Sequence, residues 1–295
     1  MHERFPECDS GILVGQPGAV LEKSDRHRPS DTWYHEVAPP LRLAGWIASI
    51  WETRIPELGE ARVRIMPNAC VDLVFYVSDP SWGEGPAAIV APPHRSYVVG
   101  STLRSFMVRS IGWRHVVGAS LLPTGVAPLL GLPARVIGES VAFLGDVIGK
   151  RAEELERRVI DGPPDGAMQR LAAALQETRV LRQADGIVEQ AVRLVRHTHG
   201  RKRMDDLAAG VNVSPRRLER HFTEQIGISA KTFSRLVRFD RVVRDIAARG
   251  TLSWVQFALA HGYSDQAHFI NEFKEFAGIT PAQFEREALN TRTES

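Results

Sequence analysis

From Ile187 to the end of the chain, hydrophobic residues recur with the three- and four-residue spacing of α-helices. Serine, aspartate or proline precedes several of these runs and glycine follows them, which marks helix starts and ends. The C-terminal part is therefore predicted to be entirely helical. The predicted helices are Ile187–His197, Met204–Ala209, about 214–226, Ala230–Arg249, Ser253–Ala260 and about 264–277.

The last of these helices, about 264–277, has one apolar and one polar face. Three phenylalanines share the inward stripe, Ser264 or Asp265 can cap the start, and Gly278 ends the helix. With the short helix before it and a tight turn at Gly262, it forms a helix-turn-helix whose outer face suits a DNA major groove. The inward residues are Phe269, Phe273 and Phe276. At about 100° per residue the outward ones are Gln266, Ala267, Asn271 and Lys274.

A second helix-turn-helix is predicted earlier in the chain. Gly210 turns the chain after Met204–Ala209, Ser214 caps the next helix, and Pro215 suits its first position. Leu218 and Phe222 face inward in this helix, about 214–226. Its outward residues are Arg216, Arg220 and Thr223.

The long helix Ala230–Arg249 lies between these two units. Its 20 residues span about 30 Å at about 1.5 Å per residue. Two helices that enter successive major grooves lie roughly 34 Å apart. The connector is therefore predicted to act as a ruler that spaces two recognition helices.

The pattern before residue 123 is different, because short β-branched and aromatic runs alternate with Pro, Gly and Ser. Such spacing predicts a small antiparallel barrel or sandwich. The first two strands are predicted to form a strand-turn-strand unit around Pro67-Asn68, and Leu41–Trp51 is predicted to be a helix. The predicted strands are Ala61–Met66, Cys70–Val77, Ala88–Ala91, Tyr97–Val99, Phe106–Ile111 and Val116–Leu122.

Helices are predicted to flank this β region. They cover Val126–Leu130, Val141–Ile148, Gly149–Ile160 and Ala167–Leu181. The last two share an apolar stripe that either pairs with a second copy or packs on its own β domain. That stripe is Leu155, Val159, Leu171 and Leu175. The predicted class is α+β, with a loosely ordered arm at 1–37, a β-rich domain at 38–149, a helical linker at 150–182, a DNA-binding domain at 183–290 and a tail at 291–295.

Composition narrows the class of protein. A chain of 295 residues with 43% hydrophobic and 24% charged residues is typical of a soluble protein with two domains. It shows no apolar run of the roughly 20 residues that a membrane span needs and no signal-peptide pattern, so we expect a cytoplasmic protein. Cys8 and Cys70 are the only cysteines, which leaves no thiolate cluster for zinc, and we expect neither metal nor cofactor. Basic residues outnumber acidic ones roughly two to one over 201–250, as expected of a surface that meets phosphate.

Several ordered motifs carry a resemblance to a known family. The C-terminal run and the first predicted recognition helix resemble AraC/XylS-type transcription regulators. The matching residues are Gly262-Tyr263-x-Asp265, His268-Phe269, Phe273-Lys274 and Gly278-x-Thr280-Pro281, with Ser214, Leu218, Phe222 and Gly227. The resemblance implies binding to promoter DNA near RNA polymerase. Asn271 departs from the family, which usually carries Arg there.

The N-terminal part resembles, more weakly, an uncharacterised domain that precedes AraC-type DNA-binding segments. The resemblance covers roughly 41–149 and implies a role in sensing or assembly. It is carried by Ile65-Met66-Pro67-Asn68-Ala69-Cys70-Val71-Asp72-Leu73-Val74-Phe75, Val99-Gly100 and Leu122-Pro123-Thr124-Gly125.

Side-chain chemistry predicts which bases each recognition helix contacts. Arg216 and Arg220 can donate a bidentate pair to guanine, Gln266 and Asn271 have the amide geometry that suits adenine, and Ala267 can touch a thymine methyl. We therefore expect a G-rich first half-site and a second that contains A/T. The helix starts at Ser214 and Ser264 can add backbone N–H contacts to phosphate. Solvated or phosphate-facing charges are expected at Arg217, Arg235, Arg238 and Lys274.

Three roles remain open for the N-terminal domain. It could hold a small-molecule effector in a pocket lined by Trp51, Phe75, Tyr76 and Trp113, although aromatic residues at such places are more often core. It could instead only form a homodimer. Catalysis would need Cys70 near Asp72 with His94 or His115, without any His-x-His or Cys-x-x-Cys spacing, so we predict a regulator and not an enzyme.

Overall fold

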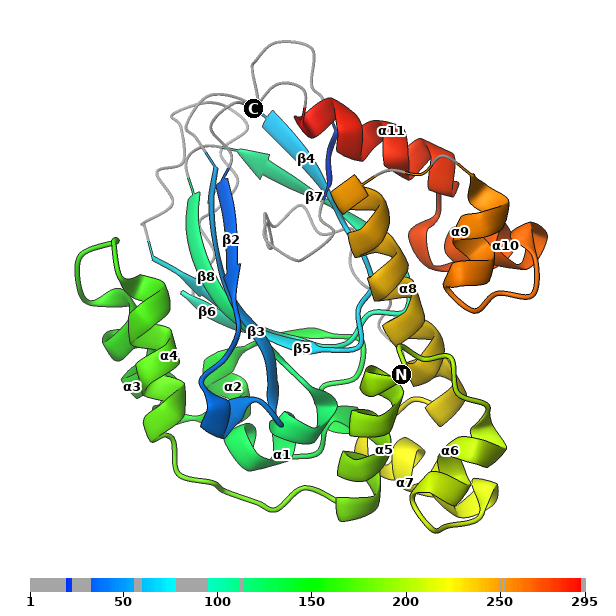
Figure 1. Cartoon of the computed structure of the whole chain (residues 1–295). Coiled ribbons are helices and arrows are strands. Elements are labelled where there is room, and N and C mark those ends of the chain that lie inside the picture. The colour runs from blue at the N-terminus through cyan, green and yellow to red at the C-terminus, as the bar shows by residue number, and fades with distance from the viewer. Residues whose placement is uncertain are drawn as a thin grey trace.

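The N-terminal half of the chain folds into two antiparallel β-sheets with helices on one side (Figure 1). The computed structural model describes residues 20–22, 33–55, 60–77, 95–111, 114–249, 251 and 253–292. Cys8, His94, Trp113 and the predicted strand Ala88–Ala91 lie outside the described residues. The strand pairs among the described residues are antiparallel, which together with the helical C-terminal part confirms the α+β class.

Strand order explains how the two sheets are built. The larger sheet has the order β2 (Trp33–Val37), β3 (Ile47–Ile55), β8 (Arg114–Leu121), β5 (Val71–Tyr76), β6 (Ser96–Val99) and β9 (Val141–Phe143). The smaller sheet has the order β1 (Val20–Glu22), β4 (Glu60–Ile65) and β7 (Phe106–Ile111). Both strands of the predicted strand-turn-strand unit around Pro67-Asn68 are present as β4 and β5, but they belong to different sheets and do not pair with each other. The described parts of the predicted arm, β1 and β2, are strands and not loose chain.

The side chains of the central strands alternate between two cores. Leu73 and Phe75 of β5 face the helices, whereas Val74 and Tyr76 face the other side of the sheet. The helices on the first side are α1 (Pro123–Leu130), α2 (Leu144–Ile148), α3 (Lys150–Ile160) and α4 (Ala167–Glu177).

The stripe shared by α3 and α4 lies in the helix-facing core of this same chain. Its residues are buried together with Leu73 and Phe75, and α3 and α4 contact β3, β5 and β8. Of the two open alternatives, packing on the chain's own β domain is the one that the structure shows. The stripe is Leu155, Val159, Leu171 and Leu175.

Two segments predicted to be helical form strands where they join the larger sheet. Leu41–Leu43 is a short 3-10 helix, after which the chain enters β3, so the predicted helix Leu41–Trp51 is wrong. The strand register shifts between Ile47 and Ser49, which places Ile47 and Ile50 in the same core at a helix-like spacing. Of the predicted helix Val141–Ile148, the first three residues pair with β6 as β9 and only α2 is helical.

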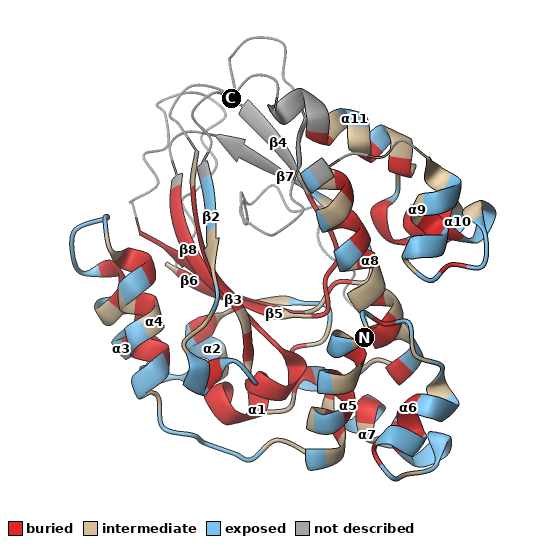
Figure 2. Ribbon diagram, viewed as in Figure 1, coloured by how far each residue is buried: buried red, intermediate tan, exposed pale blue. Residues whose placement is uncertain are grey.

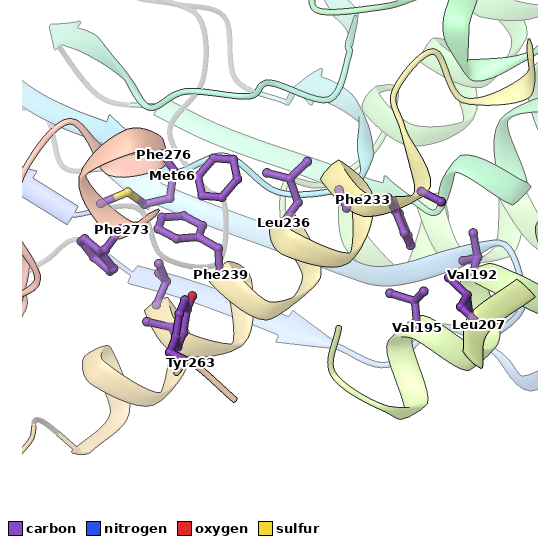
Figure 3. Packing of buried hydrophobic residues seen from close by; sticks show 14 of the residues in the cluster. Met66, Val192, Val195, Leu207, Phe233, Leu236, Phe239, Tyr263, Phe273 and Phe276 are labelled. Atoms are coloured by element: carbon purple, nitrogen blue, oxygen red, sulfur yellow. The ribbon is translucent and has the colours of Figure 1, made fainter. Parts of the chain in front are cut away.

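The C-terminal half is helical, as predicted. Its elements are α5 (Gly186–His197), α6 (Met204–Gly210), α7 (Pro215–Gln225), α8 (Ala230–Arg249), α9 (Trp254–Ala260), α10 (Gln266–Ala277) and α11 (Pro281–Arg292). An aromatic core surrounds α8, where the Phe239 ring centroid lies 5.2 Å from that of Phe273 and 5.1 Å from that of Phe276 (Figure 3).

The turns of the two helix-turn-helix units use different residues. Gly262 has a φ of 79°, as a tight turn requires. In the first unit the left-handed residue is Asn212, with a φ of 56°, and not Gly210, which ends α6. Asparagine adopts this conformation more readily than most residues because its side chain bonds locally.

The two halves of the molecule share a core. Met66 and Ala69, which follow β4, are buried among the residues of the helical domain, and Met66 lies beside Phe273 and Phe276 (Figure 3). Ser105 donates its backbone N–H to Phe276 O at 2.8 Å and its hydroxyl to Ala277 O at 2.6 Å. Through these two hydrogen bonds the β domain holds the C-terminal end of α10. Exposed residues lie on the outer sides of α6 and α10 (Figure 2).

Candidate nucleic-acid interface

The first candidate recognition helix, α7, presents a polar face to solvent. Leu218 and Phe222 are buried, and the Phe222 ring lies 5.7 Å from that of Phe233 on α8. Ser214 caps the helix by accepting the Arg217 N–H at 3.3 Å. The predicted contact residues all lie on the exposed side, namely Arg216, Arg217, Arg220 and Thr223.

Polar contacts fix α7 against its neighbours. His221 Nδ1 lies 2.7 Å from Asp185 Oδ2, and Asp185 Oδ1 also accepts the N–H groups of Ile187 and Val188 at the start of α5. Burial favours a neutral Asp185, but these donors outweigh it and hold the pKa of the carboxyl below its usual range. Glu219 on α7 accepts the Ala230 N–H at 3.2 Å, which links α7 to the start of α8.

The second candidate recognition helix, α10, is capped by Asp265 and not by Ser264. Asp265 Oδ1 accepts the His268 N–H at 2.8 Å, and Ser264 donates its hydroxyl to Asp265 Oδ2 at 3.0 Å. The His268 N–H, followed by the Ser264 hydroxyl, lowers the pKa of Asp265. A carboxylate therefore occupies the N-terminus at which we expected Ser264 to offer phosphate contacts. Of the outward residues, Ala267, Asn271 and Lys274 are exposed and Gln266 is half-buried.

A buried ionic network attaches α10 to α8. The Glu272 carboxylate accepts from Arg235 Nε at 2.7 Å and from Arg238 Nη2 at 2.8 Å, and the Arg238 guanidinium lies 4.5 Å from the Tyr263 ring centroid. Burial raises the pKa of Glu272, but the two arginines outweigh burial and hold it below its usual value. The expectation that Arg235 and Arg238 are solvated or face phosphate is wrong, because both side chains orient the second recognition helix.

The packing contacts of α8 alter the prediction that its full length spaces two recognition helices. The α7 helix packs on Phe233 and α10 packs on Phe239, so the contact points are six residues apart. Six residues correspond to about 9 Å of rise and roughly 120° of rotation around the axis. The full length of α8 therefore does not separate the two helices, and the side of α8 on which each one packs contributes to their spacing.

A groove of about 700 Å³ runs between the two helix-turn-helix units. We call it the basic groove. Its residues Arg201, Lys202 and Arg203 form the loop between α5 and α6, and Asn271 belongs to the exposed face of α10. Lys231 on α8 and His268 on α10 also line the groove.

Sequence reasoning did not identify this groove. The consecutive residues Arg201, Lys202 and Arg203 were the available signal, but nothing in their spacing places them near α10. Gly262 explains the proximity, because a Cβ atom there would lie 2.9 Å from Arg201 Cγ. The loop thus packs directly on the turn of the second helix-turn-helix.

The predicted effector-pocket residues do not share one surface. Trp51 and Tyr76 lie in the core on one face of the larger sheet, whereas Phe75 points to the helices on the opposite face. All three are buried. Trp51 Nε1 donates to Ser120 Oγ at 3.2 Å, which in turn donates to Asp72 at 2.5 Å.

The residues considered for catalysis are also divided by the sheet. Asp72 alternates to the face of Val74, whereas His115 alternates to the face of Val117 and pairs with Glu52. Burial raises the pKa of the Cys70 thiol, which disfavours a nucleophilic thiolate. Among the described residues, no group of three or more His, Cys, Asp or Glu side chains could hold a metal ion. None of the described helices has the length and apolar character to span a membrane.

Two known families match separate parts of the chain. Residues 207–287 match the helix-turn-helix domain family, and residues 35–142 match a domain of unknown function, DUF6597. No curated protein matches the chain.

Several solved structures are similar to parts of the chain. A transcriptional regulator with an AraC-type DNA-binding domain from Chromobacterium violaceum is 29% identical, with a TM-score of 0.32, over 35% of this chain and 91% of that one. The C-terminal domain of AraT, a response regulator from Geobacillus stearothermophilus, is 25% identical, with a TM-score of 0.33, over 35% of this chain and 85% of that one. ToxT from Vibrio cholerae O395 is 12% identical, with a TM-score of 0.42, over 80% of this chain and 96% of that one.

Proposed function

We propose, from the premise that this chain carries a helix-turn-helix domain of the AraC type, that it is a sequence-specific transcription regulator. In this proposal α7 and α10 enter adjacent major grooves of promoter DNA. The observation that carries the proposal is that both helices turn an exposed polar face outward and that the basic groove lies between their units. Residues 183–290 form the DNA-binding domain, and the β-rich part before them regulates it.

The two recognition helices contact different bases. Arg216 and Arg220 on α7 each present a guanidinium that can donate two hydrogen bonds to guanine. On α10, the Asn271 and Gln266 amides suit adenine, and Ala267 can touch a thymine methyl. Arg217, Thr223 and Lys274 contact the sugar-phosphate backbone beside them.

Phosphates between the two major grooves lie along the basic groove. Lys202, Arg203 and Lys231 make no ion pair with another described residue, so their charges are available to DNA. Arg235 and Arg238 line the same groove but are neutralised by Glu272 and Glu275 together. These contacts supply affinity without sequence preference, because every base pair presents the same phosphates.

Selection of bound sequences from a random duplex pool by the full chain tests this proposal. Salt must be held fixed, since phosphate contacts make affinity depend strongly on it. We expect an enriched motif of two blocks about one helical turn apart, the first G-rich and the second containing A/T. Salt-sensitive binding with no enriched motif would contradict sequence-specific recognition.

The proposal also covers the cellular location of the protein and the role of its N-terminal domain. A protein that reads a promoter acts in the cytoplasm, near RNA polymerase. The N-terminal domain would control it by binding an effector or by forming a homodimer. No chemical step is assigned to the β domain.

A further inference from the structure

We propose that Arg201 enters the DNA minor groove between the two half-sites and makes binding depend on the sequence of the spacer, which neither recognition helix contacts. The inference rests on the proposed function, since it requires that α7 and α10 enter successive major grooves. On the same face of B-DNA, the minor groove lies midway between them, about five base pairs from the centre of each half-site. A side chain held between the two helix-turn-helix units therefore meets this minor groove.

The loop between α5 and α6 lies between the two helix-turn-helix units. It lines the basic groove together with Lys231 on α8 and Asn271 on α10. Asn271 belongs to the face of α10 that is proposed to contact bases, so the loop borders that face. The loop leads directly into α6, which is the first helix of the first unit, and packs on the turn of the second unit.

The backbone of this loop is fixed against the helices on both sides. Gly200 has a φ of 69° and donates its N–H to Val195 O at 2.8 Å, and Arg201 donates its N–H to Thr198 O at 3.1 Å. A Cβ atom at Gly200 would collide with Ser234 O, so the loop packs directly on the backbone of α8. Arg201 is thus held in place relative to the helix that carries both recognition helices.

The Arg201 side chain is also partly ordered before DNA binds. A Cβ atom at Gly262 would lie 2.9 Å from Arg201 Cγ and 3.0 Å from Cδ, so the stem rests on the turn of the second unit. Arg201 Nε donates to Thr198 O at 3.3 Å. The residue is exposed, and its two terminal nitrogens have no partner among the described residues. Because the stem is already ordered, the guanidinium loses little conformational entropy when it binds.

The charges that line the basic groove favour contact with DNA. Six basic and three acidic side chains line it, which leaves a surplus of three positive charges. Arg235 and Arg238 pair with two of the carboxylates, Glu272 and Glu275, and the third carboxylate is the exposed Asp205. The basic residues of the groove that make no ion pair within the described part of the chain are Arg201, Lys202, Arg203 and Lys231.

The chemistry of the minor groove favours an arginine and an A/T-rich spacer. A·T tracts narrow the groove, which strengthens its negative potential and attracts arginine. The floor of the groove at A·T pairs presents only the acceptors adenine N3 and thymine O2, whereas guanine adds an amino donor. A guanidinium has donors only, and it is less strongly hydrated than the ammonium of the neighbouring Lys202. Arg201 therefore distinguishes A·T from G·C pairs in the spacer.

Binding of the full chain to three duplexes tests this role. Each duplex carries the two selected half-sites, and the spacer consists of A·T, G·C or inosine–cytosine pairs. An inosine–cytosine pair has the major-groove pattern of G·C but lacks its amino group in the minor groove, as A·T does. At fixed salt, we expect the A·T and inosine–cytosine duplexes to bind about fivefold or more tightly than the G·C duplex.

Two variants assign the preference to one side chain. Arg201→Ala should bind the three duplexes with similar affinity. Arg203→Ala, in the same loop, is the matched control: it should weaken binding to all three alike and keep the preference, because a phosphate contact carries no sequence information. If the preference persists in Arg201→Ala, deformation of the DNA and not Arg201 selects the spacer. If the wild type shows no preference, Arg201 does not enter the minor groove. Either result would overturn the inference.

The sequence selection separates failure of this inference from failure of the proposed function. Two enriched blocks joined by a spacer of random sequence would refute the minor-groove contact and leave the regulator function standing. The absence of any enriched motif would contradict sequence-specific recognition itself, and the minor-groove contact with it.

Discussion

The buried carboxylate of Glu272 helps to attach α10, the second candidate recognition helix, to α8. Glu272 is 4% exposed and is the shared partner of Arg235 and Arg238. Replacing it by Gln leaves the partly buried Arg238 without its counterion and Arg235 with only the exposed Glu275, so we expect Glu272→Gln to cost about 3 kcal/mol of unfolding free energy, measured by urea denaturation.

Glu275 provides a matched control on the same helix. It also pairs with Arg235, but its side chain is 53% exposed. Solvent screens such a pair, so Glu275→Gln should cost less than about 1 kcal/mol. An equal loss of unfolding free energy in the two variants would show that the burial of Glu272 does not increase its contribution to stability.

Arg216 tests base recognition at the residue scale. It is exposed on α7 and makes no ion pair within the part of the chain that the structure describes. Arg216→Ala should cost on the order of 1–3 kcal/mol on the selected site and relax preference at one position. Competition binding on the cognate site and on single-base variants measures this, with Arg157→Ala on α3 as the control. A loss of the same size on all sequences would show a phosphate contact instead.

The Asp185 carboxyl makes the free energy of unfolding of the helical domain depend on pH in the acid range. Its pKa in the folded protein is lowered, so its stabilising contribution is complete above the unfolded value of about 4 and is lost as the pH falls through the folded value. At neutral pH the wild type should therefore be more stable than Asp185→Asn. Denaturation from pH 6 to pH 3 should show this gap closing on the acid side, and a constant gap would contradict the assignment.

At the scale of elements, the loop between α5 and α6 is a proposed DNA contact that the sequence did not predict. If Lys202 and Arg203 bind phosphates, Lys202→Ala and Arg203→Ala should each weaken binding on all sequences alike. Each should also lower the slope of log K against log salt by about one. Lys150→Ala, on α3, should leave the slope unchanged. Unchanged slopes in the loop variants would remove the basic groove from the interface.

Helices were predictable because their signals are local. Ser214 and Pro215 mark the start of α7, and the end of α10 at Gly278, with a φ of 70°, was visible as a glycine after an apolar stripe. The outward residues of both recognition helices followed from the same periodicity. By contrast, the basic groove depends on Arg201 packing against the turn at Gly262, and no local pattern reports a contact between such distant residues.

Strand β3 shows why local reasoning failed in the β domain. Its apolar residues Ile47, Ile50 and Trp51 have helical spacing, which favoured a helix. The register shift after Ile47 places Ile47 and Ile50 on one face of the strand, whereas Trp51 lies on the opposite face, and pairing with β2 and β8 satisfies the backbone. Neither the shift nor the partners can be seen in the segment itself.

At the scale of the whole molecule, the two domains are joined through a shared core. Ile65 and Met66 are neighbours in the sequence, but Ile65 is buried in the β core and Met66 among the residues of the helical domain. Each side chain is no more than 2% exposed. Truncating either one to alanine should cost about 3 kcal/mol locally, because both leave a cavity in a close-packed core.

Hydrogen exchange can show in which domain each substitution lowers the stability. Met66→Ala should accelerate exchange of amides in α10 more than in β5, because Met66 packs beside Phe273 and Phe276 (Figure 3). Ile65→Ala should do the opposite and serves as the matched control. If both variants accelerate exchange equally in the two domains, the molecule opens as one unit. The β domain could then not loosen the second recognition helix separately, and control of DNA binding through Met66 would be excluded.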